Sequence, residues 1–424
     1  MMWRSLVLSV VVCALVVVPA AAQDHPDSAP SSVSAPAAAD QPGAPHAPAA
    51  IDVDDLWHLV RHSGLASDDD GTRGHRFFVL APTIGSKPTT GFTGGLSGNV
   101  AFFAGDPSTT HISTIIGGAK VSQLGQVLFG GRMAWFTTDD AWFLLADGKM
   151  TWTSQSTYAL GADAPLTSGT NSRLDVMKLY GTAYRHVAPG LFVGGGLNVS
   201  THFNIRPGTT SLEGWDEAEF VSYNEAHGFA SDHQTSSGLN VGVRYDTRDN
   251  GINPDGGVLA SATYRTFFAR FLGGDSTWQE LSLDARTYWK LTASGRQKLA
   301  VWFLGDLVTG GTAPFWDLPS TSMDGRSARG YGEGRYRGEQ LLYWEAEYRA
   351  TLTSNGLLGA VAFANLTTVG SAETGERLFQ SYAPAAGFGL RVLLNKRSRT
   401  NLCADWGWGK DGSRGFYLAI QEAF

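Results

Sequence analysis

The chain has 424 residues, of which 43% are hydrophobic, 11% aromatic and only 17% charged. Mean hydropathy is nonetheless slightly negative, at −0.11, so apolar residues must alternate with polar ones instead of forming long blocks. Beyond position 22 no apolar run approaches the roughly 20 residues that a spanning helix requires. A multispan helical membrane protein is therefore excluded, and the aromatic content excludes a disordered chain.

Charge and cysteine content narrow the class of protein further. The formal net charge is −7, which leaves no overall basic surface for phosphate backbones, so we expect no nucleic-acid partner. Of the two cysteines, Cys13 lies in a segment that we expect to be removed. The mature chain then keeps Cys403 alone and forms no internal disulfide.

The first 50 residues are predicted to precede the folded part of the chain. Residues 1–22 combine a positive charge at Arg4, an apolar stretch and small residues before Gln23, which is the pattern of a cleaved secretory signal. Residues 23–50 consist mainly of Ala, Pro, Ser and Asp and read as a linker, because such a composition cannot bury enough apolar area to fold.

Residues 51–74 are predicted to form a short amphipathic helix and a connector. The apolar residues of the helix recur at helical spacing: Val53, Leu56, Trp57 and Val60. His58 and His62 lie four residues apart, as metal ligands on a helix can, but Leu59 stands where a zinc hydrolase would have a glutamate. A polar helix face explains the two histidines better than a metal site.

From residue 75 to residue 424 the sequence alternates with period 2, which predicts strands. The segment 278–291 is a clear example. One face is polar, with Glu280, Ser282, Asp284, Arg286, Tyr288 and Lys290, and the other is mostly apolar, with Leu281, Leu283, Ala285, Thr287, Trp289 and Leu291. In a soluble sandwich the charged face would meet solvent, whereas in a membrane barrel it would face the lumen.

Sixteen such segments can be counted. They lie near 77–85, 94–104, 111–122, 126–137, 141–157, 173–187, 190–204, 237–248, 257–268, 278–291, 297–309, 341–353, 356–368, 382–394, 400–409 and 415–424. Connections after even-numbered segments are short, and the three longest, 160–172, 206–236 and 310–340, all follow odd-numbered ones. Bacterial outer-membrane barrels have an even strand number and this alternation of short and long connections. The sequence thus predicts an all-β, transmembrane antiparallel barrel of about 16 strands in the outer membrane of a Gram-negative bacterium.

The chain ends on a predicted strand whose last residue is aromatic. Phe416, Leu418, Ile420 and Phe424 are predicted to share its outward face. A terminal aromatic at Phe424 resembles the C-terminal signal by which outer-membrane barrels are recognised for insertion. Glu422 interrupts the outward apolar row near the membrane boundary, where a charge is less costly than at mid-depth.

Three segments carry the most specific motifs. Residues 244–257 form a strand and turn that contain Asp246, Arg248, Pro254 and Gly256. Residues 327–338, Ser-Ala-Arg-Gly-Tyr-Gly-Glu-Gly-Arg-Tyr-Arg-Gly, form a glycine-rich loop between the eleventh and twelfth strands, with Arg329, Gly330 and Tyr331 at its tip. Residues 401–418 read as a last hairpin. Together they resemble the BamA/TamA superfamily of outer-membrane proteins, also called bacterial surface antigens, over residues 75–424.

This resemblance implies that the Arg329 loop folds back into the barrel and docks on the inner wall. Many members have an aspartate where Asn365 stands here, so Glu345 and Glu347 are expected to provide the countercharge for Arg329. The exported region before the barrel, residues 23–75, is too short for a POTRA domain, the periplasmic module by which assembly and secretion members receive clients. The chain resembles members that are little more than a barrel.

The resemblance also implies a role in handling protein or lipid at the outer membrane, without cofactor. The expected partners are outer-membrane lipids, the barrel-assembly machinery during insertion and a protein or lipid client. A passive pore or a structural barrel is the alternative, since charged residues are predicted to face the lumen: Glu280, Asp284, Arg286, Glu345, Glu347 and Arg349. A barrel enzyme is not expected, because the spacing of four polar loop residues, His227, Ser231, Asp232 and His233, fixes no triad.

Overall fold

The structure is a computed structural model and describes residues 76–87, 91–123, 125–208 and 214–424. The expected signal (residues 1–22), linker (23–50) and helix with its connector (51–74) lie outside the described residues.

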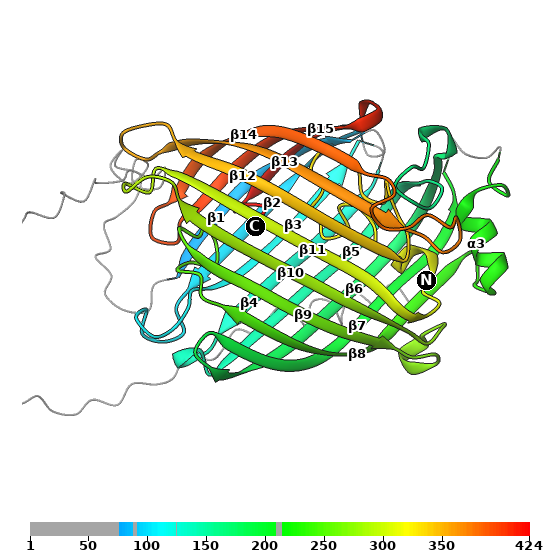
Figure 1. The fold of residues 1–424 in the computed structure, drawn as a ribbon, viewed down its shortest axis with the longest axis horizontal. Helices are drawn as coiled ribbons and strands as arrows, with labels where there is room; N and C mark the ends of the chain where they lie inside the picture. Colours follow the sequence, from blue (N-terminus) through cyan, green and yellow to red (C-terminus); the bar gives the residue numbers. More distant parts are fainter. Residues whose placement is uncertain (1–75, 88–90, 124, 209–213) are drawn as a thin grey trace, which may run out of the picture. The chain divides into compact units, whose positions relative to one another are not determined.

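Sixteen antiparallel strands form a closed barrel in which each strand pairs with its neighbour in sequence and β1 meets β16 (Figure 1). The strands are β1 (Phe77–Lys87), β2 (Gly91–Phe102), β3 (Ser113–Ser122), β4 (Val127–Phe136), β5 (Trp142–Thr157), β6 (Thr170–Ala188), β7 (Leu191–Pro207), β8 (His233–Asp246), β9 (Gly257–Phe267), β10 (Trp278–Lys290), β11 (Gln297–Gly311), β12 (Gln340–Thr351), β13 (Leu358–Gly370), β14 (Ala383–Asn395), β15 (Thr400–Gly409) and β16 (Arg414–Ile420). The predicted strand number, class and antiparallel order are confirmed.

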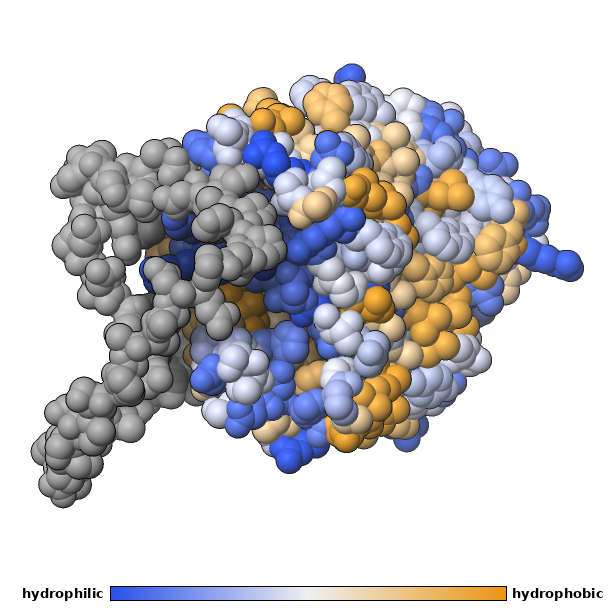
Figure 2. All heavy atoms as spheres, turned by 60° about the vertical axis from the view of Figure 1, so that its left-hand side comes forward, coloured by the Kyte–Doolittle hydropathy of each residue, from blue (hydrophilic) through white to orange (hydrophobic). Residues whose placement is uncertain are grey.

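Side-chain alternation produces an apolar outer wall and a polar lumen. On β12, Leu342, Trp344 and Ala346 face outward, whereas Glu345 and Glu347 are buried inside the barrel. Figure 2 shows the apolar side chains along the outer wall and hydrophilic ones toward the ends. Within the described part of the chain, no helix is long and apolar enough to cross a membrane.

The connections differ in length at the two ends, which sets the orientation. Short turns at one end mark the periplasmic side, and longer loops at the other mark the extracellular side. The longest described connection, residues 312–339 between β11 and β12, leaves the extracellular end, as does α3 (Glu219–His227). The 3-10 turns are η2 (Thr138–Asp140), η3 (Leu166–Ser168), η4 (Phe271–Gly273), η5 (Phe315–Asp317) and η6 (Lys410–Gly412).

The last strand ends earlier than the alternation predicts. β16 stops at Ile420, and Gln421 has a φ of +77°, which turns the chain inward. Phe424 is buried in an apolar cluster inside the barrel and stacks on Trp302, with 5.2 Å between ring centroids. The predicted position of Phe424 on the outward face is therefore wrong. Glu422 does not lie at the membrane boundary either, because it turns into the lumen and meets Arg391 at 2.7 Å.

The barrel closes at a weakly paired seam. β1 and β16 share one registered pair, Ser86 with Phe416. By contrast, β15 and β16 are paired continuously from Leu402–Ile420 to Trp408–Arg414. Because β16 is short and the chain then turns inward, most of the described part of β1 has no strand partner on that edge.

Candidate functional site

Residues 312–339, called here the lumen loop, extend from the extracellular end into the barrel. Its tip is almost completely buried, with Arg329 3% and Tyr331 1% exposed. Tyr331 and Tyr336 belong to an apolar cluster with wall residues such as Tyr343 on β12 and Ala385 on β14. The loop thus fills part of the lumen and contacts strands from several directions.

The Arg329 guanidinium group is surrounded by carboxylates. Its Nη2 atom contacts both Glu345 and Glu347 on β12, and its Nη1 donates a hydrogen bond to Asp405 Oδ2 on β15 at 2.6 Å. The Phe363 ring on β13 lies 3.8 Å from the guanidinium carbon. The planar fork of an arginine can satisfy several acceptors and an aromatic face at once, which a lysine cannot.

Asp405 is a partner of Arg329 that the sequence analysis missed. It lies 76 positions from Arg329 along the chain but on the lumen face of β15, close to the loop tip. Asn365 donates from Nδ2 to the Arg329 backbone carbonyl at 3.0 Å. Asn365 therefore holds the loop backbone, while the countercharge comes from Asp405 and the two glutamates.

Glycines on both sides permit the close approach of the tip to β15. Gly330 has a φ of +114°, and a Cβ there would lie 2.9 Å from the Ala385 Cβ. On β15, a Cβ at Gly407 would lie 2.8 Å from the Gly330 nitrogen, and one at Gly409 would lie 2.4 Å from the Tyr331 ring. The run Asp405-x-Gly407-x-Gly409 on one strand face is the sequence signal that could have identified this docking surface.

Tyr331 fixes the tip by hydrogen bonds to two strands. Its hydroxyl donates to the Pro384 carbonyl at 2.5 Å and accepts from the Lys410 backbone N–H at 2.9 Å. Tyr417 on β16 accepts from the Gly330 N–H at 3.0 Å through its hydroxyl oxygen. The Arg-Gly-Tyr tip therefore binds to β14, to the connection after β15, and to β16, next to the barrel seam.

The ion pairs around Arg329 continue toward the C-terminus. Arg391 lies 2.5 Å from Asp405 and 2.7 Å from Glu422. Arg349 contacts Glu347 at 2.7 Å and donates to the Phe424 carbonyl at 2.8 Å. Loop tip, wall and C-terminal residues thus share one buried polar network.

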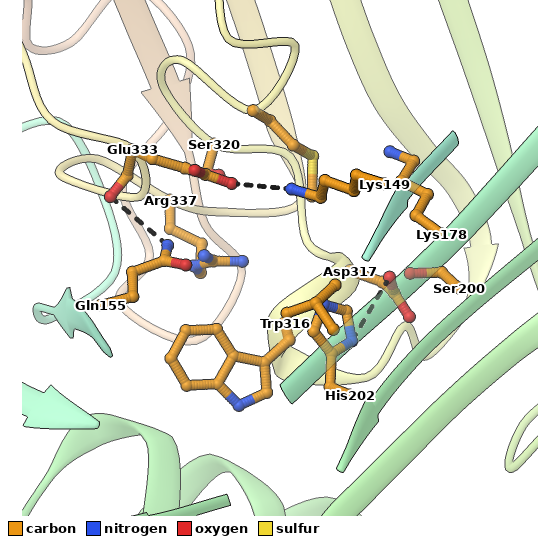
Figure 3. Close-up of a pocket in the computed structure, with 12 residues that line it drawn as sticks. Lys149, Gln155, Lys178, Ser200, His202, Trp316, Asp317, Ser320, Glu333 and Arg337 are labelled. Atoms are coloured by element: carbon orange, nitrogen blue, oxygen red, sulfur yellow. Dashed lines mark hydrogen bonds and ion pairs between the residues drawn. The ribbon is translucent and has the colours of Figure 1, made fainter. Parts of the chain in front are cut away.

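A second set of contacts holds the base of the lumen loop (Figure 3). Glu333 points toward Lys149 on β5, with 3.1 Å between the charged atoms. Asp317 lies 3.9 Å from His202 on β7. Burial raises the pKa of Asp317 to about 6, against the lowering effect of nearby hydroxyls. These residues line a cavity of about 20 Å³, which is room for about one water molecule.

Comparison with known protein families identifies the family of this barrel. Residues 147–424, which include the lumen loop and β12 to β16, match the Omp85 superfamily domain. The chain belongs to the Omp85 superfamily. It is accordingly a Gram-negative outer-membrane protein, as the sequence predicted. No curated protein sequence is significantly similar to it.

Two solved structures illustrate the shared Omp85 fold. BamA from Haemophilus ducreyi lacking POTRA domains 1-3 matches with a TM-score of 0.50 and 12% identity, over 82% of this chain and 69% of that one. CdiB from Acinetobacter baumannii matches with a TM-score of 0.51 and 14% identity, over 82% of this chain and 59% of that one. At such identities the likeness concerns the fold, and this chain spans less than two thirds of the CdiB chain.

The turn motif of this Omp85 domain is also built from ion pairs. Asp246 accepts from Arg244 at 2.6 Å and from both Nε and Nη2 of Arg248 at 2.9 Å. Pro254 is buried, and Gly256 donates its N–H to Asp249 at 3.1 Å. A Cβ at Gly256 would meet nothing, whereas one at Gly257, where φ is +96°, would lie 2.3 Å from the Thr247 carbonyl oxygen. The steric need for glycine is therefore at position 257.

The polar residues of the long extracellular loop do not form a triad. His227 binds Glu373 at 2.8 Å, and His233 binds its neighbour Asp232 at 2.8 Å. Within the described ranges, no group of three or more His, Cys, Asp or Glu residues could hold a metal ion.

Proposed function

We propose that this Omp85 barrel handles protein or lipid substrates at the outer membrane through its β1–β16 seam, with the lumen loop docked inside. The observation that carries the proposal is the seam itself, where a single registered pair joins two strands. Backbone groups left without a partner at a strand edge are a template for pairing with another chain. Opening this seam would also place the lumen in contact with the lipid phase.

The position of the lumen loop supports the same proposal. Its tip contacts Tyr417 on β16 and the connection after β15, which form one side of the seam. A loop that is anchored there by Arg329 keeps that side rigid, so that movement would be confined to the β1 side. The proposed role requires no catalytic group, so we propose that the protein is not an enzyme. The expected partners are a protein or lipid client, the surrounding lipids and, during insertion, the barrel-assembly machinery.

Locking the seam tests this proposal. In a chain with both natural cysteines replaced by alanine, Ser86→Cys with Phe416→Cys places one thiol on each strand of the seam. We expect that the oxidised form will not restore the outer-membrane protein and lipid composition of a strain lacking the gene, and that reduction will restore it. Ala119→Cys with Phe129→Cys, a pair between β3 and β4, is the matched control. Full restoration by the locked seam would reject the proposal.

A passive pore is the second candidate, because charged side chains line the lumen. These charges pair with one another, as Asp284 does with Arg286 at 2.6 Å and Glu280 with Arg265 at 2.9 Å. Conductance in planar bilayers separates the two candidates. We expect small, irregular currents from a barrel with a docked loop, whereas steady currents of porin size would favour the pore. A passive pore would also keep its activity when the seam is locked.

A further inference from the structure

The turn between β8 and β9, residues 247–256, does not stay beside its own strands. Ile252 at its tip is buried against Ala101 and Ile112, which belong to β2 and to the connection between β2 and β3. On another side, Asp249 forms an ion pair with Arg399 in the turn between β14 and β15, at 2.6 Å. The turn therefore reaches two separate parts of the periplasmic rim.

The strand order shows which parts of the barrel wall these contacts connect. In a ring of sixteen strands, β8 and β9 lie opposite β1 and β16, so β2 and β15 belong to the far wall. One turn that touches both β2 and the connection after β14 has to extend across the mouth of the barrel. We call residues 247–256 the periplasmic lid.

His111, on the rim between β2 and β3, joins the lid to the wall. Its Nδ1 atom lies 2.5 Å from Asp140 Oδ2, and its backbone N–H donates to Asp140 Oδ1 at 2.8 Å. The backbone of Arg248, at the start of the lid, also raises the pKa of His111. An imidazole that faces both a carboxylate and a backbone acceptor is favoured in its charged form, in which both nitrogens carry a proton.

The second attachment of the lid consists of ion pairs made by Asp255. Asp255 of the lid contacts Lys298 on β11 and lies 3.4 Å from Arg399. Although burial raises the pKa of Asp255, these cations outweigh it and hold the pKa below its usual value. The Asp255 carboxylate is therefore still ionised, and this side of the lid is still paired, when His111 loses its proton.

We propose that the periplasmic lid closes the mouth of the barrel and that loss of the His111 proton releases it, so that access to the lumen from the periplasm depends on pH. The charged groups that face the ring are Asp140 on the rim, Asp246 at the end of β8 and Arg248 in the lid. Asp246 is shared by Arg244 and Arg248, so the countercharge of the His111 ring is Asp140. The proposal concerns access to the lumen and is independent of which client uses the seam.

The electrostatics give the direction of the effect. The hydrogen bond that the ring donates to Asp140 raises the pKa of His111 above 6.5, against the lowering effect of burial. A histidine with a raised pKa in the closed state stabilises that state at low pH, and the stabilisation is lost as the pH rises through the raised value. The lid should therefore be closed near pH 6 and open more often in the alkaline range.

Thiol accessibility measures the lid directly. Ile252→Cys is placed in the chain with Cys13→Ala and Cys403→Ala, purified in detergent micelles, and labelled with a water-soluble maleimide at pH 6 and at pH 8.5. The rate is divided by that of Ser354→Cys, an exposed site in another periplasmic turn, which removes the pH dependence of the thiol itself. We expect this ratio to rise several-fold at the higher pH, because His111 is then neutral and the closed state loses its stabilisation.

Variants at position 111 distinguish proton loss from a purely structural role. His111→Gln keeps a hydrogen-bond donor without a charge and should give a high ratio at both pH values. His111→Lys keeps the charge and should give a low ratio at both. His227→Gln, at the extracellular end, should behave like the unchanged chain. Ile112→Cys, on the rim side of the same contact, repeats the measurement if Ile252→Cys fails to fold. A ratio independent of pH and of residue 111 would overturn the proposal.

Discussion

Two segments enter the lumen, one from each end, and they are held in different ways. The lumen loop places Arg329 between two fully buried glutamates and Asp405. The periplasmic lid uses Arg399 and Asp249, which form an equally short pair but have side chains 36% and 40% exposed. The ion-pair distances in the lumen loop and in the lid are the same. The paired side chains are buried in the lumen loop and partly exposed in the lid.

This difference has consequences for strength. Breaking a buried pair by removing one partner costs about 3–5 kcal/mol, because it leaves an uncompensated buried charge. An exposed pair contributes only about 0–1 kcal/mol and is screened by salt. The lumen loop is therefore a permanent part of the barrel interior, whereas the lid is attached weakly enough to open.

The largest effect is expected for Arg329→Ala. The change leaves Glu345, Glu347 and Asp405 facing one another with fewer cations, at a cost of about 3–5 kcal/mol. Because the loop can move away from the wall, we expect it to be released while the barrel remains folded. Chymotrypsin should then cleave near Tyr331, with the heat-shifted band on an unboiled gel largely retained.

Two variants complete this test. Arg329→Lys keeps the charge but loses the fork and should recover only a small part of the protection. Arg326→Ala, in a partly exposed position of the same loop, should leave the protection of the loop from chymotrypsin unchanged. If Arg329→Ala matches wild type in loop protection and in assembly yield, the ion pairs are not what holds the loop.

Asp317→Asn, at the base of the lumen loop, is expected to stabilise the folded protein, by less than Arg329→Ala destabilises it. Burial raises the pKa of Asp317 to about 6. The ionised form is thus disfavoured in the folded protein, and stability is lost as the pH rises from about 4 to about 6. At pH 7.5 the amide should remove a cost of up to about 3 kcal/mol and slow hydrogen exchange in residues 315–320. At pH 5 the gain should be smaller.

Asp324→Asn is the control, because Asp324 is exposed on the same loop and its backbone partners can bind the amide oxygen equally well. Faster exchange in Asp317→Asn at pH 7.5 would mean that the carboxylate is a favourable anchor and not a cost.

The sequence predicts the lumen loop better than the periplasmic lid, for a physical reason. Glu345 and Glu347 follow directly from period-2 alternation on the strand next to the loop. Asp405 could not be found in this way, because its contact with Arg329 depends on barrel closure and on how deeply the tip enters. The same limit applies to His111, which meets the lid only when opposite walls are brought together.

At the C-terminus, the alternation of apolar and polar residues predicts the wrong position for Phe424. It places Phe424 on the outer face of the barrel, because nothing in the sequence signals the positive φ at Gln421. The decisive interactions are distant ones: Glu422 binds Arg391, and Phe424 stacks on Trp302. Strand number, in contrast, depends only on local alternation and loop lengths, and it was predicted correctly.

Tyr331→Phe separates the contribution of hydrogen bonds to docking of the lumen loop from that of ion pairs, because it removes hydrogen bonds without removing a charge. The variant leaves the Pro384 carbonyl and the Lys410 N–H without their partner, which costs about 1–3 kcal/mol where such groups are buried. We expect chymotryptic cleavage between that of wild type and that of Arg329→Ala. Tyr382→Phe, an exposed tyrosine, is the matched control. Cleavage equal to that of Arg329→Ala would mean that the hydroxyl, and not the guanidinium group, dominates docking.

The smallest effect is expected for Arg399→Ala at the rim. Its pairs with Asp249 and Asp255 are partly exposed, so their loss should change the free energy of unfolding by about 1 kcal/mol or less. Because Lys298 still binds Asp255, the lid should remain closed at pH 6 but open at a lower pH than in wild type.

Added salt should reproduce part of this shift in wild type and little of it in the variant, because screening acts on the same pair. The labelling ratio of the Ile252→Cys thiol measures both effects. If Arg399→Ala instead opened the lid completely at pH 6, the exposed pair would be the main attachment, and His111 would have only a minor role.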